Sequence, residues 1–538
     1  MTSVSVSDLA YAHPGGDLLF SEVSFRVPSG SCAGLVGANG VGKSTLLRIL
    51  AGDTEQDTGT VSIDGDALYM PQNVGTDAGT VRELLLQTAP RRLRTAGTRM
   101  LEDERALAAG DHEAGVRLGE AIGEWSTLGG YELEGRWDAV CRRVLKSPLD
   151  QAGDRDAHTL SGGERKRLVL ELLFASDAPA LLLDEPDNFL DIPGKRWLEE
   201  TIKSSRKTVL VISHDRELLS AACDSIVTLE GHGAWTHGGS YRGYPEAREH
   251  RQQLMADRVT RWKEEERRLY NLMKTFKERA KYESGWAKKA DAMETRWRRF
   301  VDEGPPPEPV VDRQIRPRLK GGDSARRAVI LENLTIPGLV RRADDEVHFG
   351  ERLGLIGPNG TGKSHLMRLL AGEPIEHEGT ARLGPRVTPG LFTQHNIRPE
   401  FAEPNTVLDV MTRLTSSNLE HAMNGLARYH LQDAARRPCS TLSGGQRARL
   451  EILCLEQEGH NLLLLDEPTD NLDIPSSEAL EEALEGFEGT VVAVSHDRSF
   501  LRGLDRFLLL DGDGTLTSIP DAGRALEALG AAPVPASA

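Results

Sequence analysis

Residues 32–50 read CAGLVGANGVGKSTLLRIL, an apolar run followed by a glycine loop and then a helix-favouring segment. Residues 352–370 repeat the pattern as RLGLIGPNGTGKSHLMRLL. Both match GxxxxGK[ST] between a predicted strand and a predicted helix, the pattern of a phosphate-binding loop, or P-loop. Backbone N–H groups of such a loop surround nucleotide phosphates, and the N-terminus of the helix adds partial positive charge. A chance glycine turn is not expected twice in this context, so the sequence predicts two ATP sites.

Each residue type in the loop has its own chemical task. The lysines reach the β- and γ-phosphates, and the serine hydroxyls hold Mg²⁺. The expected nucleotide contacts are Gly37, Asn39, Gly40, Gly42, Lys43, Ser44 and Thr45 in the first copy, and Gly357, Asn359, Gly360, Gly362, Lys363, Ser364 and His365 in the second.

The rest of the chain repeats around the two loops. LSGGERKR at 160–167 returns as LSGGQRAR at 442–449, LLLDEPDNFLD at 181–191 returns as LLLDEPTDNLD at 463–473, and SHD at 213–215 returns at 495–497. The two P-loop lysines are 320 residues apart, whereas the later motifs are 282 apart. The first copy therefore holds about 40 extra residues. Residues 90–144, rich in Ala, Arg, Glu and Leu, predict a helical insertion there.

Two carboxylates end the apolar strand of LLLDEP in each copy. Open parallel sheets bind ligands at the carboxyl ends of their strands. The aspartate would contact the ligands that coordinate Mg²⁺ rather than the ion itself. The glutamate would orient and polarise the water that attacks the γ-phosphate. The histidine of SHD, which also follows an apolar run, is expected to contact the γ-phosphate. These residues are Asp184, Glu185 and His214 in the first copy and Asp466, Glu467 and His496 in the second.

Composition is typical of a soluble globular protein. The chain has 538 residues, of which 39% are hydrophobic and 27% charged, enough for several packed domains. No apolar run approaches the roughly 20 residues of a membrane-spanning helix, and the N-terminal sequence has no features of a secretory leader. The five cysteines are scattered without a CxxC pair, which argues against disulfides, structural zinc and iron–sulfur clusters and favours a reducing cytoplasm.

Charge is distributed unevenly along the chain. Residues 241–327 hold 23 Lys and Arg against 15 Asp and Glu, a net charge of +8, so the remaining residues carry −25 of the total of −17. The segment contains three tryptophans and predicts two long helices, roughly 245–275 and 286–303, with a break at Ser284-Gly285 and a stop at PPPEP. A charged helical pair that packs only on itself is one interpretation. The contrast in sign favours attraction to RNA phosphate.

Taken together, the P-loops, a glutamine after a strand (Gln72 and Gln394), LSGG, LLLDEP and SHD resemble the ATP-binding cassette (ABC) superfamily. LSGG decides this, because other P-loop ATPases lack it. The resemblance implies that LSGG of one cassette closes over the ATP held by the other, and that the glutamines act at Mg²⁺. Site one would then pair the first P-loop with Ser443, Gly444, Gly445 and Gln446. Site two would pair the second P-loop with Ser161, Gly162, Gly163 and Glu164.

The resemblance narrows to class F of the superfamily, because two cassettes share one chain with a basic helical linker and no membrane domain. The GSYRGY stretch at 239–244 also resembles that class. The expected fold is α/β, with two ABC-type P-loop ATPase domains in tandem joined by a long α-helical hairpin linker. The expected parts are ATPase domains at 1–240 and 328–520, the linker at 241–327, and an Ala- and Pro-rich disordered tail at 521–538.

Class F implies an ATPase that acts on the 70S ribosome in the cytoplasm, as a monomer whose cassettes pair within the chain. The linker would reach large-subunit RNA and peptidyl-tRNA near the peptidyl-transferase centre. Protection of the ribosome from large-subunit antibiotics and a general role in relieving stalled ribosomes both remain open. The ATPase subunit of a membrane exporter fits less well, because it gives the basic linker no role. A DNA-acting cassette ATPase usually carries long coiled coils or zinc cysteines, which this sequence lacks.

The sequence departs from the family pattern where adenine is expected to bind. The aromatic residue that stacks on adenine in the family aligns with His13, beside Tyr11, in the first copy. In the second copy the position falls near Ile336, which has no π-face.

Overall fold

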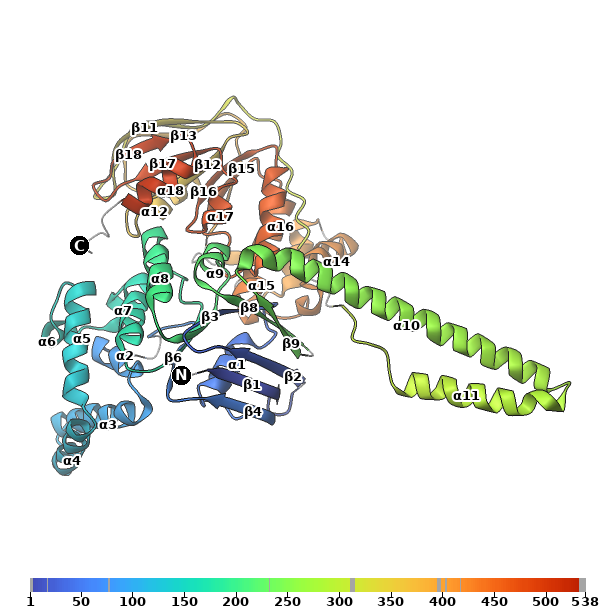
Figure 1. Ribbon diagram of the computed structural model, residues 1–538. Coiled ribbons are helices and arrows are strands. Elements are labelled where there is room, and N and C mark those ends of the chain that lie inside the picture. The colour runs from blue at the N-terminus through green and yellow to red at the C-terminus, as the bar shows by residue number, and fades with distance from the viewer. Residues whose placement is uncertain are drawn as a thin grey trace. The chain divides into compact units, whose positions relative to one another are not determined.

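The computed structural model describes residues 3–16, 18–75, 78–231, 233–309, 315–393, 398–401, 404–416 and 418–531. They form two compact units, residues 1–238 together with 313–538, and residues 239–312. The first unit contains two similar α/β halves, called here the first half (1–238) and the second half (313–531). The second unit is a helical hairpin (Figure 1). The tandem α/β fold expected from the repeat is confirmed.

The first half is built on a six-stranded sheet of order β5-β6-β7-β3-β8-β9. Its strands pair in parallel except for β8 with β9. The inner strands are buried along their whole length, as suits a parallel sheet covered on both faces. The strands are β3 (Cys32–Val36), β5 (Ala67–Met70), β6 (Ala180–Asp184), β7 (Thr208–Ile212), β8 (Ser225–Glu230) and β9 (Gly233–Gly238).

The second half repeats this sheet in the order β14-β15-β16-β12-β17-β18. Carboxyl ends of parallel strands share one edge, so the loops after β12, β15 and β16 meet there, as do those after β3, β6 and β7 in the first half. The strands are β12 (Arg352–Ile356), β14 (Pro389–Phe392), β15 (Leu462–Asp466), β16 (Thr490–Val494), β17 (Arg506–Leu510) and β18 (Leu516–Ile519).

An antiparallel three-stranded sheet accompanies each large sheet, in the orders β2-β1-β4 and β11-β10-β13. Apolar residues on alternate positions of these strands join the core, as in Val4, which pairs with both Val27 and Ile63. The strands are β1 (Val4–Ala12), β2 (Leu18–Val27), β4 (Thr58–Ile63), β10 (Arg327–Ile336), β11 (Val340–His348) and β13 (Glu378–Leu383).

The helices of the first half include three within residues 91–144, which form an arm. Trp125 and Trp137 are each 1% exposed and hold the arm together, with ring centroids 6.0 Å apart. The arm consists of α3 (Arg91–Ala108), α4 (Ala114–Thr127) and α5 (Gly130–Val144). The other helices are α1 (Lys43–Leu50), α2 (Val81–Gln87), α6 (Leu149–Ala152), α7 (Gly162–Ala175), α8 (Ile192–Ser204) and α9 (Arg216–Ala222).

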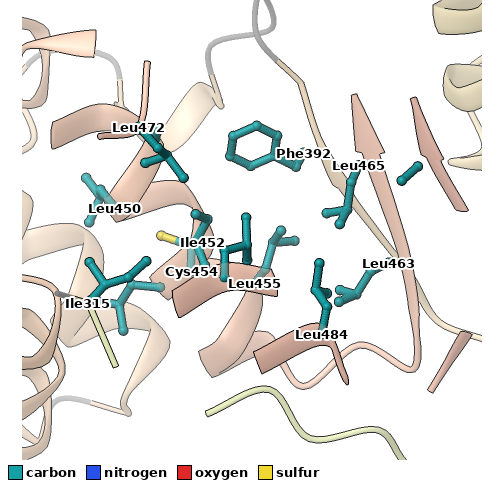
Figure 2. Packing of buried hydrophobic residues seen from close by; sticks show 14 of the residues in the cluster. Ile315, Phe392, Leu450, Ile452, Cys454, Leu455, Leu463, Leu465, Leu472 and Leu484 are labelled. Carbon is teal, nitrogen blue, oxygen red and sulfur yellow. The ribbon is translucent and has the colours of Figure 1, made fainter. Parts of the chain in front are cut away.

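One buried cluster of the second half lies between α15 and the central sheet, and a second joins the central strands to α12 and the three-stranded sheet. Leu450, Ile452 and Leu455 of α15 belong to the first cluster, together with Leu463 of β15 and Phe392 of β14 (Figure 2). The helices are α12 (Lys363–Leu370), α13 (Val407–Leu414), α14 (Leu419–Arg428), α15 (Gly444–Glu458), α16 (Ile474–Glu485), α17 (Arg498–Leu501) and α18 (Ala522–Ala531).

The hairpin consists of α10 (Tyr244–Ala280) and α11 (Ala287–Asp302), which run side by side (Figure 1). Aromatic side chains pair between the two helices along their length. The ring centroids of the three pairs are 5.4 Å apart for Trp262–Phe300, 5.7 Å for Tyr270–Trp297 and 5.5 Å for Phe276–Trp286. Aromatic contacts therefore hold the helices together and leave most charged side chains on the outside.

The C-terminal segment differs from the expectation of a disordered tail from residue 521. Ala522–Ala531 form the helix α18, whose residues Ala525 and Leu529 are 1% and 2% exposed in the core of the second half. Arg196 of α8 donates to the carbonyl of Leu526 at 3.0 Å. The Ala-rich composition suggested disorder, but alanine is also the best helix former, and here its helix has an apolar surface to cover.

Candidate active sites

The two P-loops depend on glycines in left-handed backbone conformations. Gly40 and Gly42 have φ angles of 81° and 104°, and Gly360 and Gly362 have φ angles of 82° and 98°. A residue with a side chain would be strained at these positions. The loops therefore turn so that their N–H groups can face a phosphate, as the sequence pattern predicts.

Each P-loop surrounds its own lysine. Lys43 Nζ donates to the carbonyl oxygens of Gly37 at 2.8 Å and Ala38 at 3.3 Å. Lys363 makes the two equivalent contacts, each at 2.8 Å. Burial lowers the pKa of Lys43, and nearby carboxylates, among them that of Asp473 in the second half, act against this shift. Contact of the two ammonium groups with the γ-phosphate remains a prediction.

Two amides hold the glutamate of site one. Gln72 Nε2 donates to Glu185 Oε2 at 2.5 Å, and Asn188 Nδ2 donates to the same oxygen at 2.6 Å. His214 Nε2 lies 3.8 Å from Oε1. Glu185 has a φ of 47°, a strained value that its surroundings must maintain. Burial raises the pKa of Glu185, and the adjacent Asp184 adds to the shift.

Asp184 provides the position expected for a Mg²⁺-holding carboxylate. It is 1% exposed, and burial raises its pKa, whereas hydrogen bonds from the hydroxyls of Ser44 and Tyr69 lower it. The Tyr69 hydroxyl donates to Oδ2 at 3.3 Å. Oδ1 is buried and has no hydrogen-bond partner among the described residues. A buried carboxylate oxygen of this kind beside the Ser44 hydroxyl fits the oxygen ligands and bound waters that Mg²⁺ prefers.

The glutamate of site two keeps the nearby histidine, with His496 Nε2 3.6 Å from Glu467 Oε1, but its other partners differ. Glu467 Oε2 accepts from the backbone N–H of His496 at 3.0 Å, and His496 Nε2 lies 3.0 Å from Asn359 Oδ1. Asp470 occupies the position of the asparagine that holds the glutamate in site one. Burial raises the pKa of Glu467, and the carboxylate of Asp470 adds to the shift. Gln394, expected at Mg²⁺, lies outside the described residues.

Each LSGG segment begins a helix with a reciprocal cap. Ser161 Oγ accepts from the N–H of Glu164 at 3.2 Å, and the Glu164 carboxylate accepts from the N–H of Ser161 at 2.9 Å. Ser443 and Gln446 form the same capping box at α15. The box fixes the serine and the glycine N–H groups that follow it at a helix N-terminus, where an anion is favoured.

The two halves meet so that each LSGG faces the P-loop of the other half. Asn359 Nδ2 donates to the carbonyl of Phe189 at 3.2 Å, and Asn39 Nδ2 donates to the carbonyl of Asn471 at 3.4 Å. A Cβ on Gly445 would lie 3.1 Å from Asn39 Nδ2, so LSGG of the second half lies against the P-loop of site one.

Site two contains a cavity of about 490 Å³, a size typical of small-molecule sites. Residues from both halves enclose it. Its lining includes Ser161, Gly162, Gly163, Asn359, Gly360, Gly362, Lys363, Ser364, His365, Asp466, Glu467 and His496. The structure thus brings together most of the residues that the sequence assigned to one composite site, whereas Glu164 does not line the cavity.

An aromatic row leads to the P-loop of site one. The rings of His13 and Tyr11 have centroids 5.5 Å apart, and those of Tyr11 and Phe20 are 6.2 Å apart. A Cβ on Gly42 would lie 2.8 Å from Phe20, so the row ends at the P-loop. His13 is the exposed outer member of the row, and its contact with adenine remains a prediction.

In site two the position expected for adenine stacking, Ile336, is 3% exposed in the core, and Leu339 lines the cavity instead. A Cβ on Gly362 would lie 2.8 Å from Leu339, and one on Gly42 would lie 2.9 Å from Leu19. Leu19 and Leu339 are therefore equivalent. The spacing of 320 residues that relates the P-loop lysines would have identified them both.

None of the helices that the structure describes has the length and apolarity that crossing a membrane requires.

The profile of the ABC transporter family matches residues 20–188 and 340–470, which contain both P-loops. An "Antibiotic resistance protein" of Mycobacteroides abscessus is 44% identical over 96% of this chain and 98% of its own length. The "Tylosin resistance ATP-binding protein TlrC" of Streptomyces fradiae is 31% identical over 89% of this chain and 92% of its own. "ABC transporter F family member 2" of Arabidopsis thaliana is 30% identical over 96% and 77%, respectively.

Proposed function

This chain belongs to the ABC transporter family, in its F class, and is accordingly an ATPase; from that premise we propose that it is a cytoplasmic factor that uses ATP to bind the ribosome and protect it from large-subunit antibiotics. Two relatives support the resistance role through their names, the "Antibiotic resistance protein" of M. abscessus and the tylosin resistance protein of S. fradiae. We propose that the protein works as a single chain, because each ATP site draws residues from both halves.

The charge of the hairpin is the observation that carries this proposal. Residues 267–299 of the hairpin hold 11 Lys and Arg against 4 Asp and Glu, a net charge of +7, whereas the whole chain carries −17, so RNA phosphate attracts this part of the hairpin and is repelled elsewhere. At 37 residues, α10 is about 55 Å long. Tyr282, between the helices, is 89% exposed, which leaves its ring available to stack on a base. This end of the hairpin would reach large-subunit RNA and peptidyl-tRNA.

The carboxylates and histidines supply the chemistry of ATP hydrolysis in this proposal. Glu185, held by Gln72 and Asn188, would accept a hydrogen bond from the attacking water and aim it at the γ-phosphate. Burial lowers the pKa of His214 to about 3, with Lys43 contributing, so the imidazole is neutral at pH 7 and can donate one N–H to the γ-phosphate. Glu467 and His496 would have these roles in site two.

Mg²⁺ would neutralise charge on the β- and γ-phosphates when bound with ATP. The residues that would hold it are Ser44, Gln72 and Asp184 in site one and Ser364, Gln394 and Asp466 in site two.

ATP would close the halves and commit the hairpin to the ribosome, and hydrolysis would release it. The hairpin would shift peptidyl-tRNA and rearrange the peptidyl-transferase centre. A tenfold loss of drug affinity needs only about 1.4 kcal/mol of coupling free energy between binding of the hairpin and binding of the drug.

The test is to express the chain in a drug-sensitive bacterium and measure minimum inhibitory concentrations. We expect resistance to rise several-fold for at least one of the macrolides, lincosamides, streptogramins or pleuromutilins, with tylosin as the first choice. Drugs that act on the small subunit should be unaffected. No change for any large-subunit drug, with the protein found in the ribosome pellet, would favour the general translation factor instead.

The hydrolysis-deficient variant Glu185→Gln with Glu467→Gln provides the matched control. It keeps the size of both side chains but removes the carboxylates, so turnover should fall by about 10²–10⁴ while ATP still binds. We expect this variant to accumulate on ribosomes and inhibit translation rather than confer resistance. Near-normal hydrolysis would contradict the assignment of both glutamates.

A further inference from the structure

The loop that carries each SHD histidine is anchored on both sides of it. In the first half, the N–H of Asp215 donates to Ser213 Oγ at 2.9 Å, and the Asp215 carboxylate accepts from the N–H groups of Glu217 and Leu218 at 2.9 and 3.0 Å. His214 lies between these anchors, so a shift of Asp215 moves it. The second half repeats the arrangement around His496, with Asp497 in the place of Asp215.

The arginine that follows each loop reaches the opposite half. Arg498 Nη2 forms an ion pair with Glu199 of α8 and lies 3.6 Å from Asp215 Oδ1. Arg216 Nη2 forms an ion pair with Glu481 of α16 and lies 3.9 Å from Asp497 Oδ2. Each arginine therefore makes the same two contacts with the opposite half, and Arg216 makes a further one with Glu478 Oε1 at 3.5 Å.

The two loops are therefore joined to each other. From His214 the path runs through Asp215 to Arg498, which is two residues from His496 in the chain. The reverse path runs from His496 through Asp497 to Arg216. No other described residue is needed to connect the two histidines.

These ion pairs are partly withdrawn from water. The side chains of Arg498, Glu199 and Asp215 are 8%, 11% and 3% exposed. Lys195 adds a cation, with its Nζ 3.1 Å from Asp215 Oδ2, and Ser477 is its equivalent in the second half. A charge buried this far is costly to leave without its partner, so the pair holds its geometry more strongly than a surface ion pair would.

We propose that Arg216 and Arg498 are positioning residues that couple the two ATP sites, each fixing the histidine of the opposite half for contact with the γ-phosphate. This rests on the proposed role of His214 and His496. It goes beyond that role, because hydrolysis at site one then depends on Arg498 of the second half. Hydrolysis at site two likewise depends on Arg216 of the first half.

A third arginine that forms an ion pair between the halves, Arg502, offers a matched control. Arg502 Nη2 lies 2.7 Å from Glu217 Oε1, but its side chain is 61% exposed and it does not contact the anchoring aspartates. If the cross-half arginines only held the halves together, Arg502 would be expected to matter in the same way as Arg498.

The experiment isolates one site at a time in the full-length chain. In a Glu467→Gln background only site one hydrolyses ATP. There we expect Arg498→Gln to lower kcat about tenfold with KM for ATP changed less than twofold, because ATP still binds but the histidine is misplaced. Arg498→Lys should recover kcat to within about threefold. Arg502→Gln should leave both constants unchanged.

The reciprocal arm is tested in a Glu185→Gln background, where Arg216→Gln should lower the kcat of site two. Glu199→Gln provides a second route to the first arm, because it removes the anchor of Arg498 and lies outside both sites. Thermal unfolding checks that each variant is folded. Glu199→Gln should lower the kcat of site one as Arg498→Gln does. It also tests this arm if Arg498→Gln unfolds the protein.

The coupling would be overturned if Arg498→Gln and Arg502→Gln lowered kcat equally, or if Arg498→Gln changed only KM for ATP. The arginines would then only hold the two halves together. A wrong assignment of Glu185 and Glu467 would give a different result from a wrong coupling proposal. In that case the Glu185→Gln, Glu467→Gln double variant would still hydrolyse ATP, whatever the arginine variants do.

Discussion

The two ATP sites differ at the residue three positions after the glutamate. Asn188 donates to Glu185 at 2.6 Å, whereas the equivalent residue in site two is Asp470. Asn188→Asp would replace an amide donor with a second carboxylate facing Glu185. We expect kcat of site one, measured in a Glu467→Gln background, to fall about tenfold, as is typical for loss of a hydrogen bond to a charged group.

The control for this substitution is site two. In a Glu185→Gln background, Asn188→Asp should leave the kcat of site two within about twofold of its starting value. An equal loss of kcat at both sites would show that Asn188→Asp disturbs the fold of the first half rather than Glu185 alone.

A buried glutamate in the second half makes stability depend on pH. Burial raises the pKa of Glu451 to about 7, against about 4.3 in an unfolded chain. Between these values the folded protein binds the proton more tightly, so its stability falls as pH rises through this window. Glu451→Gln should therefore raise the free energy of unfolding more at pH 8 than at pH 5, by on the order of 2 kcal/mol.

Denaturant unfolding at the two pH values measures this difference. Val169 occupies the equivalent position of the first half, which shows that the fold does not need a carboxylate there. A gain of the same size at pH 5 and pH 8 would mean that Glu451 is ionised in the folded protein across the whole range.

Sequence reasoning proposed the two glutamates as reacting residues but did not predict which side chains hold them. Glu185 and Glu467 followed from LLLDEP, yet their left-handed φ angles of 47° and 52° have no signature in the sequence. Asn188 was missed because one copy alone reads as an ordinary turn. Comparing DEPDNFLD with DEPTDNLD shows the change from amide to carboxylate, but its meaning depends on a distance that only the structure supplies.

At the scale of elements, the hairpin divides its cations between two roles. Lys274, Lys281 and Lys288 are exposed, and Lys277, whose side chain is 46% exposed, forms an ion pair with Glu294 of the facing helix at 2.7 Å. Replacing the three exposed lysines with Gln should reduce the slope of log affinity for ribosomes against log salt by about 2 to 3, since each phosphate contact contributes about 0.7–0.9. Co-sedimentation at several salt concentrations measures the slope.

Lys277→Gln is the control, and it should change the slope by less than one contact. Basal ATPase activity should stay the same in both variants. An unchanged slope in the triple variant would mean that the hairpin is a solvated helical pair that does not contact RNA.

The helix α18 should contribute measurably to the stability of the second half. Leu529 is 2% exposed, so Leu529→Ala should lower the free energy of unfolding by about 2–4 kcal/mol. Glu527→Ala, on the exposed face of the same helix, should change it by less than about 0.5 kcal/mol. Urea unfolding compares the two, and equal effects would mean that α18 adds nothing to the core.

The elements that the sequence could predict are those with a repeat or a period. The repeat gave both sheets, and the long proline-free run gave the hairpin. The C-terminal helix was missed because its signal, Ala525, Leu526 and Leu529 on one face, is short and lies in an Ala-rich segment. Its order depends on the surface it covers, including Arg196 of α8, which lies 330 residues before Leu526.

At the scale of the whole molecule, ATP hydrolysis at each site should require the P-loop of one half and the LSGG segment of the other. Lys43→Ala disables site one. Adding Ser443→Ala to it should cause no further loss of ATPase activity, because both changes lie in site one. Adding Ser161→Ala instead should lower the remaining activity about tenfold or more, because Ser161 belongs to site two, and losing one phosphate-facing donor typically costs this much or more.

ATPase assays of the three variants decide the pairing. If the losses are reversed, so that Ser443→Ala has the larger effect, each LSGG serves the P-loop of its own half. The pairing followed from a family resemblance, whereas the contacts that set it in place, such as Asn359 with Phe189, required the structure.

The lysine at position 195 has a consequence for how this protein could evolve. In an assembly of two identical subunits every mutation is present twice, so a lysine here would come with a second cation at the matching place. Fusion of both halves into one gene removes that constraint, and Lys195 is matched by the neutral Ser477. A substitution at one of these two positions therefore leaves the residue at the other unchanged.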